Sequence, residues 1–211
     1  RALVLTPTRE LAMQCEEFLR AYGRHSKLRS VCIVGGMPMR PQIKAVQAGC
    51  DVVIATPGRL LDLEHQRVLH LSRVEILVLD EADRMLDMGF IPDIRHIMRL
   101  LTAKNRQTLL FSATMPSEIA HLAFDLMRDP IKVEVAPPAT PVDKVRQVAH
   151  PVEPHLKDAL VKHLLQAEGW DQVLIFTRTK RSADVLCDFL LRAGESVGVI
   201  HGDLHQKARL R

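Results

Sequence analysis

Short apolar runs alternate with amphipathic stretches along the first two thirds of the chain. These runs contain few polar residues, which is typical of strands that helices cover on both faces. After Thr8, apolar residues recur at three- and four-residue spacing, so they share one face of a helix that the Thr8 hydroxyl can cap. We expect strands at residues 2–5, 31–34, 52–55, 76–79, 109–111 and 131–135, and further helices at 41–48, 91–101 and 116–127.

The alternation stops at residues 136–141, where three of the six residues are proline. Because proline lacks the backbone donor that helices and sheets need, this segment reads as an extended linker. Strand-helix alternation on both sides of it predicts an α/β protein with two domains, each a parallel sheet flanked by helices. We expect a first domain at 1–136, a linker at 137–143 and a second domain at 144–211, the latter with strands at 145–152, 172–177 and 196–200 and helices at 155–168 and 181–193.

Composition adds only broad limits to this organisation. The formal net charge is +4, and a mildly basic balance only weakly favours a polyanionic partner. The four cysteines form no C-x-x-C pair, which favours reduced thiols and a cytoplasmic protein. We expect no membrane association, since no apolar run approaches the roughly 20 residues that span a bilayer. The abrupt start at Arg1 and end at Arg211 lead us to expect a piece of a longer protein.

An acidic cluster follows one of the most apolar runs. Asp80, Glu81 and Asp83 lie just beyond residues 76–79, at a predicted carboxyl end of a parallel strand, where α/β proteins bind ligands. Mg²⁺ prefers one or two carboxylates together with water and phosphate oxygens. Asp80 would therefore hold Mg²⁺ through water, and Glu81 would orient or deprotonate an attacking water. The alternative is a solvated acidic turn that caps the next helix.

A hydroxyl pair follows a second buried strand. Ser112 and Thr114 come directly after residues 109–111 and would reach the same edge of the sheet, where their hydroxyls could occupy Asp83. The alternative is a simple helix cap before Pro116.

Together these segments resemble the motifs of the DEAD-box ATP-dependent RNA helicases, in that family's order. The tetrad Asp80-Glu81-Ala82-Asp83 spells the family's name in one-letter code. The sequence around the motifs is most similar to the bacterial RhlE subgroup. The resembling segments are Pro7-Thr8-Arg9-Glu10-Leu11-Ala12, Gly35-Gly36, Thr56-Pro57-Gly58-Arg59, Asp80-Glu81-Ala82-Asp83, Ser112-Ala113-Thr114, Leu174-Ile175-Phe176-Thr177 with Thr179-Lys180, and Gln206 with Arg209.

The resemblance implies two RecA-like domains, both incomplete here, that close on ATP and RNA. It implies a catalytic set of Asp80, Glu81, Asp83, Ser112 and Thr114, in which Asp80 and Glu81 contact Mg²⁺ and ATP and Asp83 bonds to Ser112 or Thr114. It also implies that the RNA backbone is contacted by Pro7, Thr8, Arg9, Gly36, Thr56, Pro57, Gly58, Arg59, Thr179, Lys180, Gln206 and Arg209. Protein partners are not indicated.

The implied RNA contacts make physical sense. A helix that starts after Thr8 offers free N–H groups to phosphate, and Gly36 and Gly58 let the backbone approach a strand closely. Aromatic residues make up only 4% of the chain, so a base-stacking platform is not expected. Contacts to phosphates position a strand without reading its sequence, which predicts little sequence specificity.

One expected element of an ATPase does not occur in the sequence. No G-x-x-x-x-G-K-[ST] loop, which cradles nucleotide phosphates, is present in the 211 residues, so we expect no ATP turnover by this chain alone. The leading interpretation for the whole protein is RNA-stimulated ATP hydrolysis coupled to local RNA unwinding. One alternative is a non-catalytic RNA-binding clamp or scaffold, and another is a helicase that acts on DNA, since spacing does not reveal contacts to 2′-hydroxyls.

Overall fold

The structure is a computed structural model that describes residues 1–135 and 146–209. The chain divides into two compact units, Arg1–Pro141 and Val142–Arg211, which are described separately. The expected linker at 137–143 lies outside the described residues. In the described part of the chain, no helix is both long and apolar enough to cross a membrane.

The first unit contains a five-stranded parallel sheet in the order β2-β3-β1-β4-β5. Its strands pair in register, so that Leu5 at the end of β1 lies between Ala55 of β3 and Leu79 of β4. The strands are β1 (Ala2–Leu5), β2 (Ser30–Ile33), β3 (Val52–Ala55), β4 (Ile76–Leu79) and β5 (Gln107–Leu110). Five of the predicted strands are thus confirmed, with small shifts at the ends of β2 and β5.

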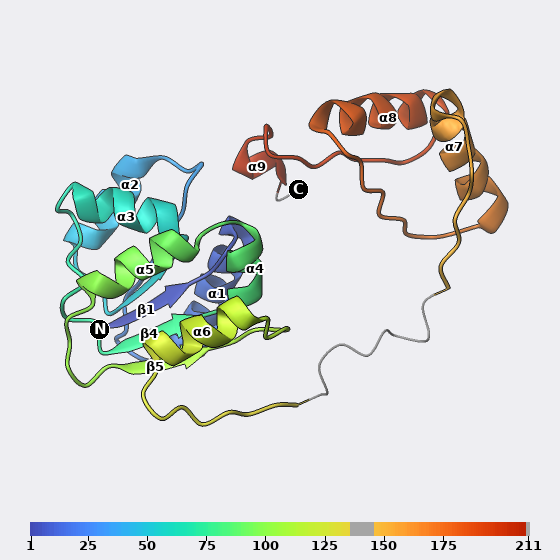
Figure 1. The fold of residues 1–211 in the computed structure, drawn as a ribbon. Helices are drawn as coiled ribbons and strands as arrows, with labels where there is room; N and C mark the ends of the chain where they lie inside the picture. The colour runs from blue at the N-terminus through green and yellow to red at the C-terminus, as the bar shows by residue number, and fades with distance from the viewer. Residues whose placement is uncertain (136–145, 210–211) are drawn as a thin grey trace. The chain divides into compact units, whose positions relative to one another are not determined.

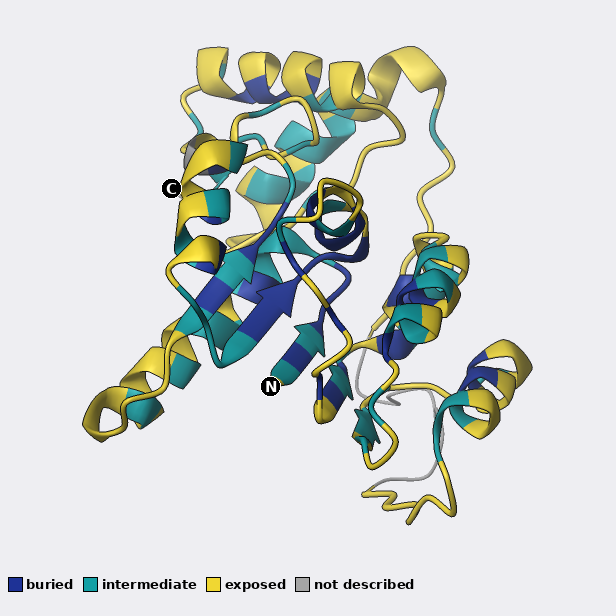
Figure 2. Cartoon of the chain, turned by 90° about the vertical axis from the view of Figure 1, so that its left-hand side faces the viewer, coloured by how far each residue is buried: buried dark blue, intermediate teal, exposed yellow. Residues whose placement is uncertain are grey.

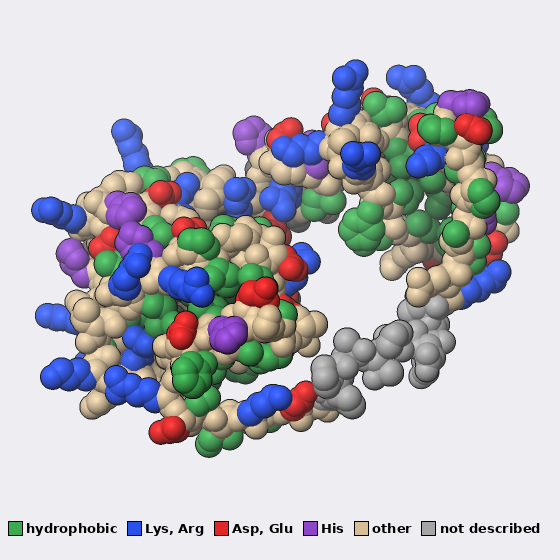
Figure 3. All heavy atoms as spheres, viewed as in Figure 1, with side chains coloured by type: hydrophobic (Ala, Val, Ile, Leu, Met, Phe, Trp, Pro, Cys, Tyr) green, Lys and Arg blue, Asp and Glu red, His purple; other side chains and the backbone are tan. Residues whose placement is uncertain are grey.

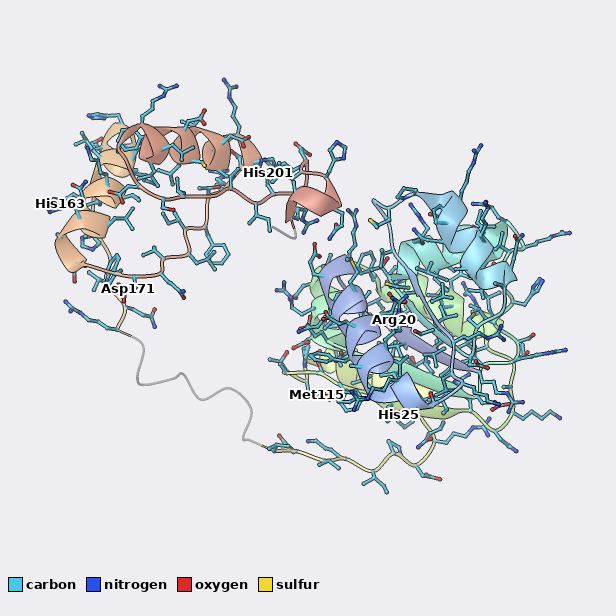
Figure 4. The ribbon with its side chains drawn as sticks, turned by 180° about the vertical axis from the view of Figure 1, so that it is seen from behind. Arg20, His25, Met115, His163, Asp171 and His201 are labelled. Carbon is cyan, nitrogen blue, oxygen red and sulfur yellow. The ribbon has the colours of Figure 1, made fainter. Side chains whose placement is uncertain are left out.

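Helices cover the two faces of this sheet unequally (Figures 1 and 2). One face carries Leu3, Leu5, Leu77 and Leu79 into the main core, where all but one of the helices contribute buried side chains. Among the described residues, the other face packs on the first helix, through the buried Ala12 and the half-buried Cys15 and Leu19, as the view from behind shows (Figure 4). The helices are α1 (Arg9–Tyr22), α2 (Met39–Gln47), α3 (Pro57–His65), α4 (Ala82–Asp87), α5 (Ile91–Leu100) and α6 (Ser117–Leu126), with a 3₁₀ turn η1 (Gly23–His25) after α1.

The strand expected at residues 131–135 is a wrong prediction. The segment is not in a strand, and Ile131, Val133 and Val135 are 92%, 81% and 97% exposed. A strand is stabilised by hydrogen bonds to a neighbour, and the apolar pattern of this segment does not supply one.

The second unit has helices where the sequence predicts them but lacks the predicted sheet. It contains η2 (Pro154–Leu156), α7 (Lys157–Glu168), α8 (Lys180–Arg192) and α9 (Gln206–Arg209). Over residues 146–209 no strand is formed, so the predictions at 145–152, 172–177 and 196–200 are wrong as far as those segments are described. The last two segments line a shared cavity of about 390 Å³ together with Leu186 and Leu190 of α8.

Candidate functional site

The carboxyl ends of the five strands form one continuous edge. In each case the residue that follows a strand donates its N–H to the last residue of the neighbouring strand, so the loops that leave the sheet are aligned. The four bonds are Thr56 N to Ile33 O (3.1 Å), Thr6 N to Ala55 O (3.0 Å), Asp80 N to Leu5 O (3.0 Å) and Phe111 N to Leu79 O (2.8 Å). The loops therefore follow the strand order, with the glycine pair at one end and Ser112-Ala113-Thr114 at the other.

Glu81 has an unusual backbone conformation. Its φ of 52° and ψ of 54° are left-handed, a region that costs a residue with a side chain roughly 1–2 kcal/mol. Bonds on both sides hold it there: Glu81 N donates to Asp80 Oδ1 at 3.0 Å, and Ala82 N donates to Phe111 O at 3.0 Å. Such strain is common at functional sites, and here it makes the two carboxylates leave the end of β4 through a sharp turn.

Asp83 connects the acidic turn to the next strand. Its Oδ2 accepts from the N–H and the hydroxyl of Thr114, at 2.9 and 2.8 Å, and its own N–H donates to Ser112 Oγ at 3.1 Å. The hydroxyl of Ser112 in turn donates to Thr114 O at 2.7 Å. The expected contact of Asp83 is therefore present with both residues. The helix-cap alternative for Ser112 and Thr114 is not what forms, because Pro116 occupies the cap position of α6 without a side-chain bond.

These bonds change the acidity of Asp83. Partial burial raises the pKa of its carboxyl, but hydrogen bonds from Thr114 and Ser112 lower it more, so that the net pKa lies below the ordinary value. A carboxyl whose pKa is lower in the folded state stabilises the fold above its unfolded pKa, about 3.9, and loses that contribution as the pH falls through the folded pKa.

Replacing Asp83 by alanine is therefore expected to destabilise the protein at neutral pH and much less in acid. Loss of the bonds to Thr114 should cost about 1–2 kcal/mol at pH 7. Thermal unfolding of the parent and of Asp83→Ala measures this difference, which should shrink as the pH falls from about 4 to below the lowered pKa of the Asp83 carboxyl. An equal difference at both ends of that range contradicts the assignment.

The glycine pair lies between two arginines. Gly36 has a φ of +69°, and a Cβ built on it would lie 2.7 Å from Cζ of Arg9, so the guanidinium of Arg9 rests against the backbone of this loop. Arg59 also contacts this loop: its Nη1 donates to Met37 O at 3.1 Å, and its Nε lies 3.5 Å from Asp62. Three of the predicted RNA-contacting segments are thus adjacent in space.

Helices α1 and α3 both start at the carboxyl edge of the sheet, and a helix N-terminus in general favours an anion. Thr8 caps α1 by accepting from Leu11 N at 3.3 Å, and the Thr6 hydroxyl donates to Thr8 O at 3.1 Å. Pro57 occupies the first position of α3, where its missing N–H costs nothing. Pro7, Thr56 and Pro57 are buried, whereas Gly58 is exposed. Among these residues, the backbone of Gly58 and the helix starts are what a nucleic-acid strand would meet.

The second unit repeats the turn that opens α1. Thr179 caps α8 by accepting from Ser182 N at 3.0 Å, and the Thr177 hydroxyl donates to Thr179 O at 3.0 Å. Each unit therefore has a T-x-T turn followed by a basic residue at the first position of a helix. The signal was visible in the sequence as Thr6-Pro7-Thr8-Arg9 and Thr177-Arg178-Thr179-Lys180, but our sequence analysis did not recognise the repeat.

Lys180 is engaged within its own unit. Its ammonium bonds to Asp203 Oδ1 in the turn before α9, and His201 in the same turn bonds to Asp184 of α8 at 2.9 Å (Figure 4). Gln206 and Arg209 lie on α9, with Gln206 buried. The structure therefore brings Thr179 and Lys180 close to the turn that leads to α9, and phosphate would compete with Asp203 for Lys180.

The acidic turn fits a cation held partly by water. Asp80 and Glu81 supply hard oxygen donors, and the described residues contain no group of three or more His, Cys, Asp or Glu that would enclose a metal. That donor set suits Mg²⁺, which usually keeps several waters and binds phosphate oxygens. Cys15 of α1 lies within electrostatic range: burial raises the pKa of its thiol, and the charges of Asp80 and Glu81 raise it further, so it stays protonated and is a poor ligand.

Lysine and arginine side chains are not concentrated at the carboxyl edge of the sheet. In the space-filling view of the first unit, Lys and Arg side chains are conspicuous where the strands begin, which is the opposite edge of the sheet (Figure 3). The candidate RNA contacts are therefore distinguished by their positions on helix starts and glycine turns, and the net charge of +4 says little about them.

Taken together, a parallel sheet with an acidic turn and helix starts at its carboxyl edge is the arrangement with which α/β proteins typically bind phosphate-containing ligands. Residues 1–122 match the family "DEAD/DEAH box helicase", and residues 156–211 match the family "Helicase conserved C-terminal domain". The chain belongs to the DEAD/DEAH box helicase family.

Curated relatives and solved structures agree with this placement. The chain is 43% identical to "ATP-dependent RNA helicase dbp2" of Neurospora crassa and 44% identical to "ATP-dependent RNA helicase DBP2" of Scheffersomyces stipitis, over 98% of this chain and 38% and 40% of those proteins. Among solved structures it is similar to a DEAD box protein from Methanococcus jannaschii, with 37% identity and a TM-score of 0.61 over 99% of this chain and 56% of that chain. The chain thus spans about two fifths of these curated relatives.

Proposed function

We propose that the protein containing this chain is an ATP-dependent RNA helicase, which couples RNA-stimulated ATP hydrolysis to local separation of short duplexes. One observation carries the proposal: Asp80 and Glu81 leave the same sheet edge as the segments with Arg9, Arg59 and Gly36, which follow strands one, two and three positions away from β4. An acid pair and a series of phosphate-binding features are therefore part of one rigid element.

The acid pair would serve the hydrolysis of ATP. Asp80 would hold Mg²⁺ through water, and Glu81 would orient the attacking water and accept its proton. The metal ion, when bound, neutralises charge on the phosphate oxygens. Asp83 does not face the reaction in this proposal, because Ser112 and Thr114 already occupy it. It instead fixes the acidic turn to the loop after β5.

The remaining edge would hold the RNA backbone. Pro7, Thr8, Arg9, Gly36, Thr56, Pro57, Gly58 and Arg59 in the first unit, and Thr179, Lys180, Gln206 and Arg209 in the second, are the proposed RNA-binding residues. If ATP and RNA both bind the closed arrangement of the two domains more tightly than the open one, each ligand favours that state. Hydrolysis at Glu81 then removes one of the two ligands and releases the strand.

Some finer assignments are proposed on narrower grounds. A relationship to the bacterial RhlE subgroup rests on the wording of residues 59–65 and 176–180 alone. A cytoplasmic location is supported by four free cysteines. For the nucleic acid, contacts through the backbone favour little sequence specificity.

The function is tested by measuring ATP turnover and duplex separation by the full-length protein, with and without RNA. We expect RNA to stimulate turnover, and RNA to compete better than DNA of the same sequence. The 211-residue chain alone should show no turnover, since it has no glycine loop to cradle the phosphates. RNA binding by the full-length protein without any ATP turnover would instead indicate a non-catalytic clamp.

A further inference from the structure

A buried glutamine braces the loop that contains the glycine pair. Gln42 lies on α2 and is only 8% exposed. Its Oε1 accepts from Val34 N at 3.1 Å, and its Nε2 donates to Val34 O at 3.1 Å and to Pro38 O at 3.3 Å. The side chain thus satisfies both backbone groups of Val34, as a neighbouring strand would, and reaches the far end of the same loop.

These three bonds enclose the residues that the two arginines contact. Val34 and Pro38 are the residues on either side of Gly35, Gly36 and Met37. Gly36 is exposed with a φ of +69°, and it lies against Arg9, while Met37 O accepts from Arg59. A short loop with a left-handed glycine has many alternative conformations. Gln42 restricts the loop to one conformation, because its side chain bonds to Val34 and Pro38 at the two ends of the loop.

We propose that Gln42 is a positioning residue for RNA binding. It holds the 35–37 loop in the conformation in which Arg9, the glycine backbone and Arg59 can all contact the same RNA strand. This inference rests on the proposed function. Gln42 does not touch the nucleic acid itself, because its side chain is directed into the protein. A residue of this kind affects the affinity for RNA while leaving the acidic turn, which follows a strand three positions away in the sheet, intact.

The test compares two variants of the full-length protein with its parent. Gln42→Leu removes all three bonds at similar volume, and Gln42→Glu keeps the acceptor for Val34 N but directs a charged oxygen at the carbonyls of Val34 and Pro38. Gln47→Leu, at an exposed position of the same helix, is the matched control. Kd is measured for a single-stranded RNA with a non-hydrolysable ATP analogue present, and for the analogue alone.

We expect both Gln42 variants to bind RNA about tenfold more weakly or worse, as befits the loss of one or more net hydrogen bonds from an ordered loop. Binding of the analogue alone and the behaviour of Gln47→Leu should match the parent. RNA binding by the Gln42 variants at the parent's affinity overturns the inference, as does an equal loss of RNA and analogue binding. Failure of both variants to fold also overturns it, because Gln42 would then be a core residue. If the parent itself does not bind RNA, the proposed function fails instead.

Discussion

Glu81→Gln in the full-length protein is expected to lower the ATP turnover number by about 100-fold or more, the usual range for a lost general base. The amide is nearly the same size as the carboxylate and keeps the left-handed turn, but it does not accept a proton from water. Binding of ATP and RNA should survive, since Asp80 and the loops with Arg9 and Arg59 are unchanged. The variant should therefore retain RNA for much longer than the parent when ATP is present.

Steady-state hydrolysis and the rate of RNA release after ATP addition measure these two effects. Asp87→Asn, which removes an exposed charge at the other end of α4, is the matched control and should behave as the parent does. Equal RNA release rates for Glu81→Gln and the parent would show that hydrolysis at this residue does not govern the closed state.

Gly36→Ala is expected to weaken RNA binding by about tenfold or more while ATP binding is retained. The new methyl group would overlap the guanidinium of Arg9, and the φ of +69° would strain any residue with a Cβ. Arg9 must then move away from the loop, and the new methyl group covers the backbone of residue 36 that the RNA would approach. Titration of fluorescent RNA with the variant, in the presence of an ATP analogue, gives the affinity.

Gly89→Ala separates the two causes. Gly89 has a similar φ of +75°, but a Cβ there meets nothing within 4 Å. This control should cost about 1 kcal/mol of stability through strain alone and leave RNA affinity unchanged. If Gly36→Ala behaves like Gly89→Ala in both measurements, contact between Arg9 and the glycine pair has no part in RNA binding.

Much of the first unit was predictable because its strands are buried on both faces. Residues 2–5, 52–55 and 76–79 are apolar throughout and form strands with those bounds. Residues 172–177 and 196–200 are also rich in apolar residues, but they form no strand. An apolar run indicates that a segment is suited to a buried strand. Whether a strand forms depends on a second segment that lies alongside and bonds to it, and the local sequence does not identify that segment.

The candidate site divides in the same way. The bonds of Asp83 to Ser112 and Thr114 were predictable, because both segments follow buried strands and parallel strands end at one edge. Gln42 was not, since a glutamine among polar neighbours on an amphipathic helix looks like part of the solvated face. The engagement of Lys180 by Asp203 was missed for a related reason: the two residues are 23 positions apart and belong to no shared pattern.

The T-x-T turn of each unit is closed by contacts within six consecutive residues, from Thr6 to Leu11 and from Thr177 to Ser182. It needs no sheet, and in the second unit it exists where no strand does. The shape of each helix start is therefore set by its own six residues rather than by the strand that precedes it. In the proposed function, each unit would therefore contribute its own locally specified contact to the nucleic-acid backbone.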